Sequence, residues 1–436
     1  MLPIRSTSLV FATLLVCGCG RPTPDSAGTP TTESNAPASP PVAPDDADAV
    51  QALQDAGFQL KKNVDGNVVE AAVSSQTDIS EALSQLTGIP GVEVLSLSGP
   101  GMTDKGLEVL KELKHIKRLD LSDSAITDDT LKVVGQLSNL QVLALRRTGV
   151  TDDGLAAISS LPAIRMIDLR NSNVTDDGVK HFSGLKTLVD LQLEKSKVTD
   201  AGIAALQDLN LKSINLNYCT SISDATLEVL GGMPSLESIQ LDYTKITDKG
   251  MVHVAKLSKL KRLRIRGADV TGTGIAAVSS LSSLERIELR DTSLDDAGLE
   301  IISELPNINY LDISECRLVT PDGLKPIGRL TGLTYLGFWE TKLNDDALNQ
   351  YGNLVNLTEL DLKATSVTDE SVPTLLKMQK LKTLNLAGTQ LSDDGFRQLT
   401  QLPVLTELNV ANTNIGFDVV DELSAKEGLK VVEFEN

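Results

Sequence analysis

The sequence has few of the residues from which catalytic and metal sites are usually built. Its 436 residues include 3 histidines, 4 cysteines and 1 tryptophan, and aromatic residues make up only 3%. No two histidines have the spacing of metal ligands, and no glycine-rich phosphate loop follows a strand pattern. We therefore expect a protein that is not an enzyme and has no cofactor or metal.

Basic charge is also scarce. Lysine and arginine number 40 against 59 aspartates and glutamates, which gives a formal net charge of −19. Binding to a phosphate backbone needs a basic face that releases counterions. Nucleic acid is therefore not expected among the partners.

Long apolar runs are missing except for a short one at the N-terminus. Arg5 precedes an apolar run from Leu9 to Val16, far shorter than the roughly 20 residues that span a bilayer. We read residues 1–18 as a signal peptide. The stretch Val16-Cys17-Gly18-Cys19 resembles the bacterial lipobox, which predicts lipidation at Cys19, with ordinary signal cleavage nearby as the alternative.

The segment after Cys19 is rich in Pro, Ser and Thr, a composition that cannot form a packed core. Residues 19–44 are therefore predicted to be a lipid-anchored linker that tethers the folded part outside the cytoplasm. The expected location is the cell envelope, with membrane contact only through the anchor. Residues 45–91 are predicted to form an N-terminal cap and a first degenerate repeat, with a helix near residues 47–56 and a hairpin turn at Asp65-Gly66.

From residue 92 to 436 the chain repeats at a period of about 24 residues. The pattern Leu-x-x-Leu-x-Leu starts about 15 times, at Val92, Ile116, Leu140, Ile164, Leu188, Leu211, Leu236, Leu260, Leu284, Ile308, Leu333, Leu357, Leu381, Leu405 and Leu429. Within one copy, the alternation from Leu140 to Leu145 predicts a short strand, and the spacing of Leu155, Ile158 and Leu161 predicts a short helix.

A recurring phrase such as Thr151-Asp152-Asp153-Gly154 falls at the start of each predicted helix. Its Thr or Ser is suited to cap the helix, and its Asp lies where the helix dipole stabilises negative charge. The expected capping residues are Thr103, Thr127, Thr151, Thr175, Thr199, Ser223, Thr247, Thr368 and Ser392, and the following Gly lets neighbouring coils approach closely. A competing hypothesis takes the stacked aspartates as a calcium ladder.

With these motifs in view, the chain resembles leucine-rich repeat proteins, and more narrowly bacterial lipoproteins of that kind. Two repeats, at residues 214–227 and 311–324, resemble the cysteine-containing subtype known from F-box proteins. The resemblance implies an α/β fold: a right-handed horseshoe solenoid like that of ribonuclease inhibitor, with a parallel concave sheet and convex helices. Cys219 and Cys316, four repeats or about 19 Å apart, should be free buried thiols.

The strand pattern also predicts which side chains face the concave side. From Leu260 onward, one column holds Arg262, Arg286, Tyr310 and Tyr335, the next holds Arg264, Glu288, Asp312 and Gly337, and the third holds Arg266, Arg290, Ser314 and Trp339. Two interpretations of these five arginines stay open. Either Glu288 and Asp312 neutralise them, or a partner supplies acidic groups and packs on the rings.

Two functions follow from this surface. The first is an envelope-anchored, non-enzymatic module that binds a protein ligand, with acidic proteins among the candidates, through Arg262, Arg264, Arg266, Arg286, Arg290, Tyr310, Tyr335 and Trp339. The second is a carbohydrate-binding or structural cell-wall protein whose partner is a glycan that stacks on the aromatic rings. Tyr218 and Tyr243, just past their strands, are expected to extend the aromatic rim.

Overall fold

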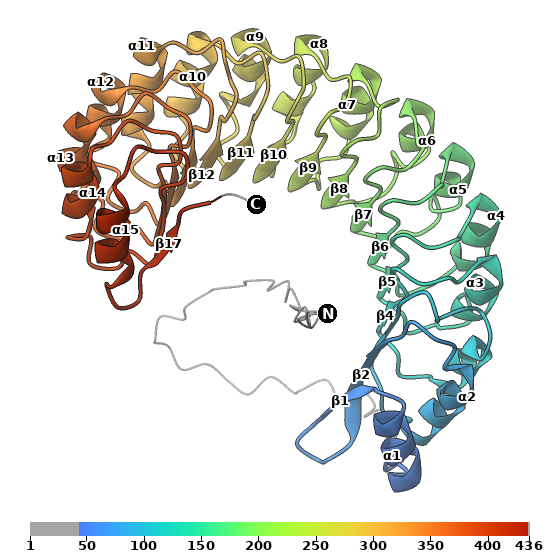
Figure 1. The fold of residues 1–436 in the computed structure, drawn as a ribbon. Helices are drawn as coiled ribbons and strands as arrows, with labels where there is room; N and C mark the ends of the chain where they lie inside the picture. The colour runs from blue at the N-terminus through green and yellow to red at the C-terminus, as the bar shows by residue number, and fades with distance from the viewer. Residues whose placement is uncertain (1–42, 435–436) are drawn as a thin grey trace, which may run out of the picture. The chain divides into compact units, whose positions relative to one another are not determined.

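The computed structural model describes residues 43–434, and the compact unit Ala43–Asn436 is a solenoid that curves into an arc (Figure 1). Strands line its inner, concave face and helices lie on its outer face. The predicted signal peptide, Cys19 and nearly all of the predicted linker lie outside the described residues.

The strands form one sheet that runs the length of the arc. The first two strands pair antiparallel, and each later strand pairs in parallel with the one before it. The strands are β1 Gln59–Lys62, β2 Val68–Ser74, β3 Val94–Ser98, β4 Arg118–Asp120, β5 Val142–Ala144, β6 Met166–Asp168, β7 Asp190–Gln192, β8 Ser213–Asn215, β9 Ser238–Gln240, β10 Arg262–Arg264, β11 Arg286–Glu288, β12 Tyr310–Asp312, β13 Tyr335–Gly337, β14 Glu359–Asp361, β15 Thr383–Asn385, β16 Glu407–Asn409 and β17 Lys430–Val432. Each of the 15 predicted repeat starts is followed by one strand, β3 to β17, which confirms the horseshoe.

Short helices cover the outer face. The α-helices are α1 Ala47–Asp55, α2 Ser80–Leu83, α3 Asp128–Val134, α4 Asp152–Leu155, α5 Asp176–Lys180, α6 Asp200–Ala204, α7 Asp224–Leu230, α8 Asp248–Met251, α9 Gly272–Ile275, α10 Asp296–Ser303, α11 Pro321–Leu324, α12 Asp345–Leu348, α13 Val372–Leu375, α14 Asp393–Leu399 and α15 Phe417–Ser424. Turns of 3-10 helix join or replace them at Ser84–Gly88, Leu107–Glu112, Ala156–Ile158, Val254–Lys256, Ala276–Val278, Lys325–Arg329, Asn349–Tyr351 and Asp369–Ser371. None of the helices in residues 43–434 has the length and apolar character needed to cross a membrane.

The core is a continuous column of aliphatic side chains between sheet and helices. In the repeat that starts at Leu140, the side chains of Leu140, Leu143 and Leu145 from the strand and Leu155 and Ile158 from the helix are all fully buried. Burying a leucine or isoleucine contributes about 1.5–3 kcal/mol. Because every repeat contributes the same set, each coil is stabilised mainly by its neighbours.

The N-terminal end has the predicted helix and hairpin. Asp46 caps α1 by accepting hydrogen bonds from the amides of Asp48 and Ala49. The hairpin turns at Gly66, whose φ of 89° lies in the left-handed region that glycine tolerates best. The side chain of Asn63 accepts hydrogen bonds from the amides of Asp65 and Asn67 and so holds this turn.

Most of the predicted helix caps are present. Thr127, Thr175, Thr199, Ser223, Thr247, Thr368 and Ser392 each accept a hydrogen bond from an early amide of their helix, and so do Thr271 and Thr320. Two predictions were wrong. Thr151 makes no cap bond, and Thr103 begins no helix, because Gly106 takes a left-handed φ of 84° and the helical turn starts only at Leu107.

The first Asp of the phrase joins one repeat to the next. Both carboxylate oxygens of Asp152 accept hydrogen bonds from Thr175, one from its amide at 2.8 Å and one from its hydroxyl at 2.5 Å. We call this arrangement the Asp staple. It recurs between Asp104 and Thr127, Asp128 and Thr151, Asp176 and Thr199, Asp200 and Ser223, Asp224 and Thr247, Asp248 and Thr271, Asp296 and Thr320, Asp345 and Thr368, and Asp369 and Ser392.

These bonds also account for the Gly of the phrase. A Cβ at Gly178 would overlap the carboxylate of Asp152, and Gly154, Gly202, Gly250, Gly274 and Gly395 meet the staple Asp of the preceding repeat in the same way. Where Thr130, Thr226 or Ser371 stands in place of Gly, its hydroxyl donates a hydrogen bond to that Asp. The staple oxygens are thus occupied by protein donors, and no group of three or more acidic side chains in residues 43–434 is arranged to hold a metal ion, which disfavours the calcium-ladder hypothesis.

Between Asp104 and Ser392, two junctions between repeats lack the Asp staple; outside this range Ser80 stands at the Asp position before Thr103, and Asp393 accepts a hydrogen bond only from the amide of Gly416. Gly272 and Pro321 stand where the stapling Asp would be, and the capping residue of the next repeat is then Asp295 or Asn344 instead of Thr or Ser. These two side chains accept hydrogen bonds within their own helices, from the amides of Gly298 and Ala347. Both unstapled junctions lie behind strands β10 to β13.

The two described cysteines are free and buried, as the repeat spacing predicts. Each stands where most repeats have a Thr or Ser that bonds its own turn, and each thiol donates to a carbonyl of the preceding repeat, Cys219 to Leu193 and Cys316 to Leu289. Burial raises the pKa of Cys219, and it raises that of Cys316 to about 11. Neither thiol has the low pKa of a reactive cysteine.

Candidate functional site on the concave face

The three predicted columns of side chains are present on β10 to β13. The strand register places Arg262, Arg286, Tyr310 and Tyr335 side by side, and next to them Arg264, Glu288, Asp312 and Gly337. The backbone ladder continues past the strands, with the amide of Gly267 bonded to the carbonyl of Arg290 and that of Glu315 bonded to Trp339. All eight predicted partner-binding residues therefore belong to one surface, which we call the arginine–aromatic cluster.

Glu288 is the centre of this cluster. Its side chain is fully buried, and its carboxylate pairs with Arg286 at 2.6 Å, Arg262 at 2.9 Å and Arg266 at 2.5 Å, with Arg264 at 3.6 Å. Burial alone would raise the pKa of Glu288, but the bond and charge of Arg286 and the charges of Arg262 and Arg266 outweigh burial and lower it. A carboxylate buried among arginines in this way stays ionised.

Two further carboxylates belong to the cluster but were missing from the predicted set. Asp242, on the turn after β9, is fully buried and pairs with Arg264 at 2.5 Å. Glu315 pairs with Arg290 at 2.6 Å. Asp242 holds the third-column position in the repeat that starts at Leu236, one repeat before the columns begin. Glu315 directly follows the third-column residue Ser314.

The predicted neutralisation by Glu288 and Asp312 is therefore real and more extensive than expected. Five guanidinium groups face four carboxylates, those of Asp242, Glu288, Asp312 and Glu315. Two donors remain in surplus, because the Nε atoms of Arg262 and Arg266 are buried without a hydrogen-bond partner. Burial also lowers the pKa of Arg262.

The aromatic rings of the cluster stack in rows along the sheet. Tyr310 and Tyr335 are parallel with ring centroids 4.0 Å apart, and the guanidinium of Arg286 lies 3.5 Å from the centroid of Tyr310. Because β11 and β13 flank β12, Tyr310 is covered on both faces. Trp339 similarly has Arg290 at 4.1 Å and Lys363 at 5.0 Å, from strands on opposite sides of β13. These contacts fix the rings in place.

No catalytic or metal constellation emerges among residues 43–434. No group of three or more His, Cys, Asp or Glu side chains there is arranged to hold a metal ion. The three histidines stand apart, His115 in the loop before β4 and His181 and His253 just after α5 and α8.

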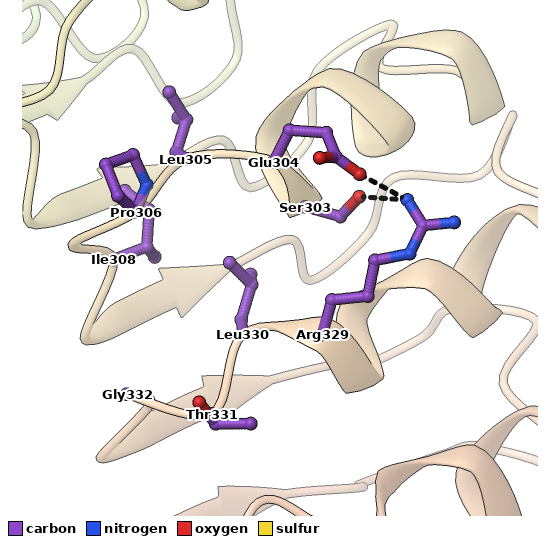
Figure 2. Close-up of a pocket in the computed structure, with 9 residues that line it drawn as sticks. All are labelled: Ser303, Glu304, Leu305, Pro306, Ile308, Arg329, Leu330, Thr331 and Gly332. Carbon is purple, nitrogen blue, oxygen red and sulfur yellow. Dashed lines mark hydrogen bonds and ion pairs between the residues drawn. The ribbon is translucent and has the colours of Figure 1, made fainter.

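One depression on the described surface lies away from the concave face. It measures about 270 Å³ and sits between two return loops, where Leu305 and Pro306 face Leu330 and Thr331 (Figure 2). Arg329 at its rim already pairs with Glu304 at 2.6 Å and Ser303 at 3.3 Å. A similar gap recurs at the equivalent loops around Pro162 and Gly184, so the depression belongs to the repeat geometry.

The repeat fold and the concave surface agree with the match to known families. The family model described as a leucine-rich repeat region matches residues 72–319 and 310–436. The chain therefore belongs to the leucine-rich repeat family. No curated protein matches its sequence.

Two solved structures show what this chain is similar to in fold. The leucine-rich repeat protein LIC12759 of Leptospira interrogans is 21% identical, with 82% of this chain and 93% of that chain covered and a TM-score of 0.55. The internalin inlF of Listeria monocytogenes is also 21% identical, with 90% and 96% covered and a TM-score of 0.49. At these identities the likeness concerns the fold alone.

Proposed function

We propose that this protein is a non-enzymatic binding module that holds a protein ligand on its concave face, centred on the arginine–aromatic cluster, and that a lipid on Cys19 anchors it in the cell envelope. The observation that carries the proposal is the cluster itself. It gathers five arginines, two tyrosines and the one tryptophan of the chain on four adjacent strands.

The cluster is organised before any partner arrives, which favours binding. Arginine, tyrosine and tryptophan dominate interface hot spots. Association costs less when such side chains are already ordered, because each immobilised flexible side chain otherwise costs about 0.5–1.5 kcal/mol. Here Glu288 holds Arg262, Arg266 and Arg286, and stacking holds Tyr310 and Trp339.

The balance of charge favours an acidic ligand. Within the arginine–aromatic cluster five guanidinium groups face four carboxylates, which leaves one guanidinium in excess. A carboxylate from a partner would balance this charge, whereas a basic partner would add to it.

The same geometry argues against sugar stacking, on which the alternative function depends. A pyranose ring stacks on an open aromatic face, and the faces of Tyr310 and Trp339 are covered by Arg286, Tyr335, Arg290 and Lys363. What these rings present to a ligand is mainly their edges. Edges and guanidinium groups suit a polypeptide surface better than a carbohydrate.

The proposal can be tested by crosslinking pull-down from an envelope extract of the source organism, with the full chain as bait. The test variant is Tyr335→Ala with Trp339→Ala, which leaves the Glu288 pairs intact. The matched control is Val252→Ser, which removes a side chain that is 60% exposed beside α8 on the outer face. We expect one protein to be retained by wild type and control and lost from the test variant. Equal capture by all three baits would refute a concave site.

The anchor is tested separately by metabolic labelling with an alkyne fatty acid. We expect the label on the wild type and not on Cys19→Ala, and the variant should leave the membrane fraction. Unchanged labelling of Cys19→Ala would contradict lipidation at this residue, whatever the outcome for the concave face.

A further inference from the structure

Tyr218 and Tyr243 form a second exposed aromatic feature, next to the arginine–aromatic cluster. They lie one residue past the last concave position of their repeats, with 40% and 38% of their surface exposed. Their rings stack with centroids 5.0 Å apart and an angle of 18° between the planes. Nothing in the core depends on them.

Both tyrosines adopt a backbone conformation that aromatic residues avoid. Their φ angles are 60° and 53°, in the left-handed region. The same position is left-handed in most repeats, with residues as different as Asn171, Lys195 and Glu315, so this conformation belongs to the repeat geometry. What distinguishes Tyr218 and Tyr243 is that they place large, exposed rings at this position, and such rings offer contact area to a partner.

The two rings are held in a short row along the edge of the concave face. The ammonium group of Lys195 lies 5.0 Å from the ring centroid of Tyr218 on one side. On the other side Tyr243 lies against Gly267, where a Cβ would overlap its ring. The row from Lys195 to Gly267 therefore exposes ring edges and hydroxyl groups, while its ring faces are covered.

Unpaired positive charge surrounds this row. Lys195 and two further exposed lysines, Lys197 and Lys245, have no ion pair within residues 43–434. Backbone pairing joins the loops that carry them, because Thr199 bridges to Ser221 and Ser223 bridges to Lys245. Lys245 belongs to the same loop as Tyr243, and Lys195 and Lys197 belong to the loop before that of Tyr218, so the lysines flank the tyrosine pair, whereas Asp291 lies at the equivalent position after Gly267.

We propose that Tyr218 and Tyr243, with Lys195, Lys197 and Lys245, form a second docking site that takes an acidic polypeptide segment. The lysines supply the charge that carboxylates require, and the tyrosine edges supply contact area and hydroxyl donors. Covered ring faces disfavour a polysaccharide here for the same reason as in the cluster. The site deepens the proposed function by extending the binding surface from β10 back to β7.

A localised chemical readout tests this site. The full chain is mixed with a peptide of repeating Glu-Glu-Phe and treated with a carbodiimide, which couples lysine amines to peptide carboxylates at zero length. The modified lysines are then mapped by mass spectrometry. Arginine does not react, so a peptide bound at the arginine–aromatic cluster would be reported by Lys363, which lies 5.0 Å from the ring centroid of Trp339, and not by the three lysines of the second site. The same peptide with Gln in place of Glu, and polygalacturonate as competitor, complete the set of probes.

The test variant is Tyr218→Asn with Tyr243→Asn, because Asn already occupies this backbone position with a φ of 56° at Asn171 and Asn412. It removes both rings without demanding a new backbone conformation. The control, Ala364→Asn, makes the same change at the equivalent position beyond the cluster, where φ is 53°.

We expect adducts enriched at Lys195, Lys197 and Lys245 in wild type and control, and about a tenfold loss of this enrichment in the test variant. Equal labelling of lysines across the surface, unchanged labelling in the test variant, or loss of the adducts to polygalacturonate as efficiently as to excess peptide would each overturn the proposal. The Tyr335→Ala, Trp339→Ala variant should keep these adducts. Failure of the arginine–aromatic cluster and failure of the second site are thus distinguishable.

Discussion

The Asp staple predicts that two neighbouring aspartates in one phrase contribute very differently to stability. In Thr151-Asp152-Asp153-Gly154, Asp152 accepts two hydrogen bonds from Thr175 in the next repeat, whereas Asp153 is exposed and makes no hydrogen bond or ion pair. Both stand in the first turn of α4, where the helix dipole favours each by about 0.3–1 kcal/mol. Asp153→Ala is therefore the matched control for Asp152→Ala.

The magnitude follows from the bonds that are lost. A hydrogen bond to a charged group contributes about 1.5–3 kcal/mol when buried, and less when it is partly exposed as here. Removing the carboxylate of Asp152 leaves the amide and hydroxyl of Thr175 to water and opens a gap beside Gly178. We expect Asp152→Ala to lower the free energy of unfolding by about 2–3 kcal/mol, and Asp153→Ala by less than about 1 kcal/mol.

The assay is urea unfolding of the full chain followed by circular dichroism, with hydrogen exchange at the amide of Thr175 as a local readout. Exchange should quicken markedly in Asp152→Ala and stay unchanged in Asp153→Ala. Equal losses of stability in the two variants would refute the reasoning, because they would mean that the aspartates act only through charge at the helix start.

The remaining predictions concern other parts of the described chain. Glu288→Gln should lower the free energy of unfolding by about 3 kcal/mol or more, since it leaves buried arginines uncompensated, and no change in the urea midpoint would contradict this. Gly272→Ala should lower the melting temperature, because a Cβ at this position would lie 2.7 Å from the amide nitrogen of Gly298, and an unchanged melting temperature would contradict this close approach of the coils. Burial would raise the pKa of Asp200, but its hydrogen bonds hold the pKa below the ordinary 3.8. The contribution of Asp200 to the free energy of unfolding is therefore full above pH 3.8 and is lost as the pH falls through the pKa of the folded state. Asp200→Asn should therefore weaken the dependence of stability on pH in the acid range. Cys316, with its pKa of about 11, should react with a thiol reagent at neutral pH only after unfolding, and rapid labelling of the native chain would disprove its burial.

The fold could be predicted from the sequence because every repeat carries the same pattern of apolar residues. The alternation from Leu140 to Leu145 and the spacing of Leu155 and Ile158 reappear with the same period, so errors in one copy are corrected by the others. The columns of concave residues followed directly, because the strand period alone decides which side chains share a face.

The Asp staple was missed for a physical reason. The helix-cap interpretation considers groups within one helix, and Asp152 does satisfy the expectation for a first-turn acid. Its actual partner, Thr175, lies in the next coil, and only the three-dimensional stacking of the coils brings the two together. The sequence signal was present at Gly272 and Pro321, because the next capping residue after each is Asp295 or Asn344 instead of Thr or Ser.

The candidate site was predicted in composition but not in its electrostatics. The spacing put the arginines and rings on one surface, yet it could not say which carboxylates would be buried with them. Asp242 lies on a turn outside the columns that were read, and the covered faces of Trp339 depend on Arg290 and Lys363 from different strands. Burial and ring contacts of this kind need coordinates.

Site-specific photocrosslinking can test directly whether the concave face binds a protein. A photoreactive amino acid would replace Tyr335 on the concave face or Val252 on the outer face, in the full chain within the envelope of the source organism. If the ligand lies on the concave face, we expect one discrete protein adduct from position 335 and none from position 252. Adducts from position 252 alone, or the same adducts from both positions, would contradict it.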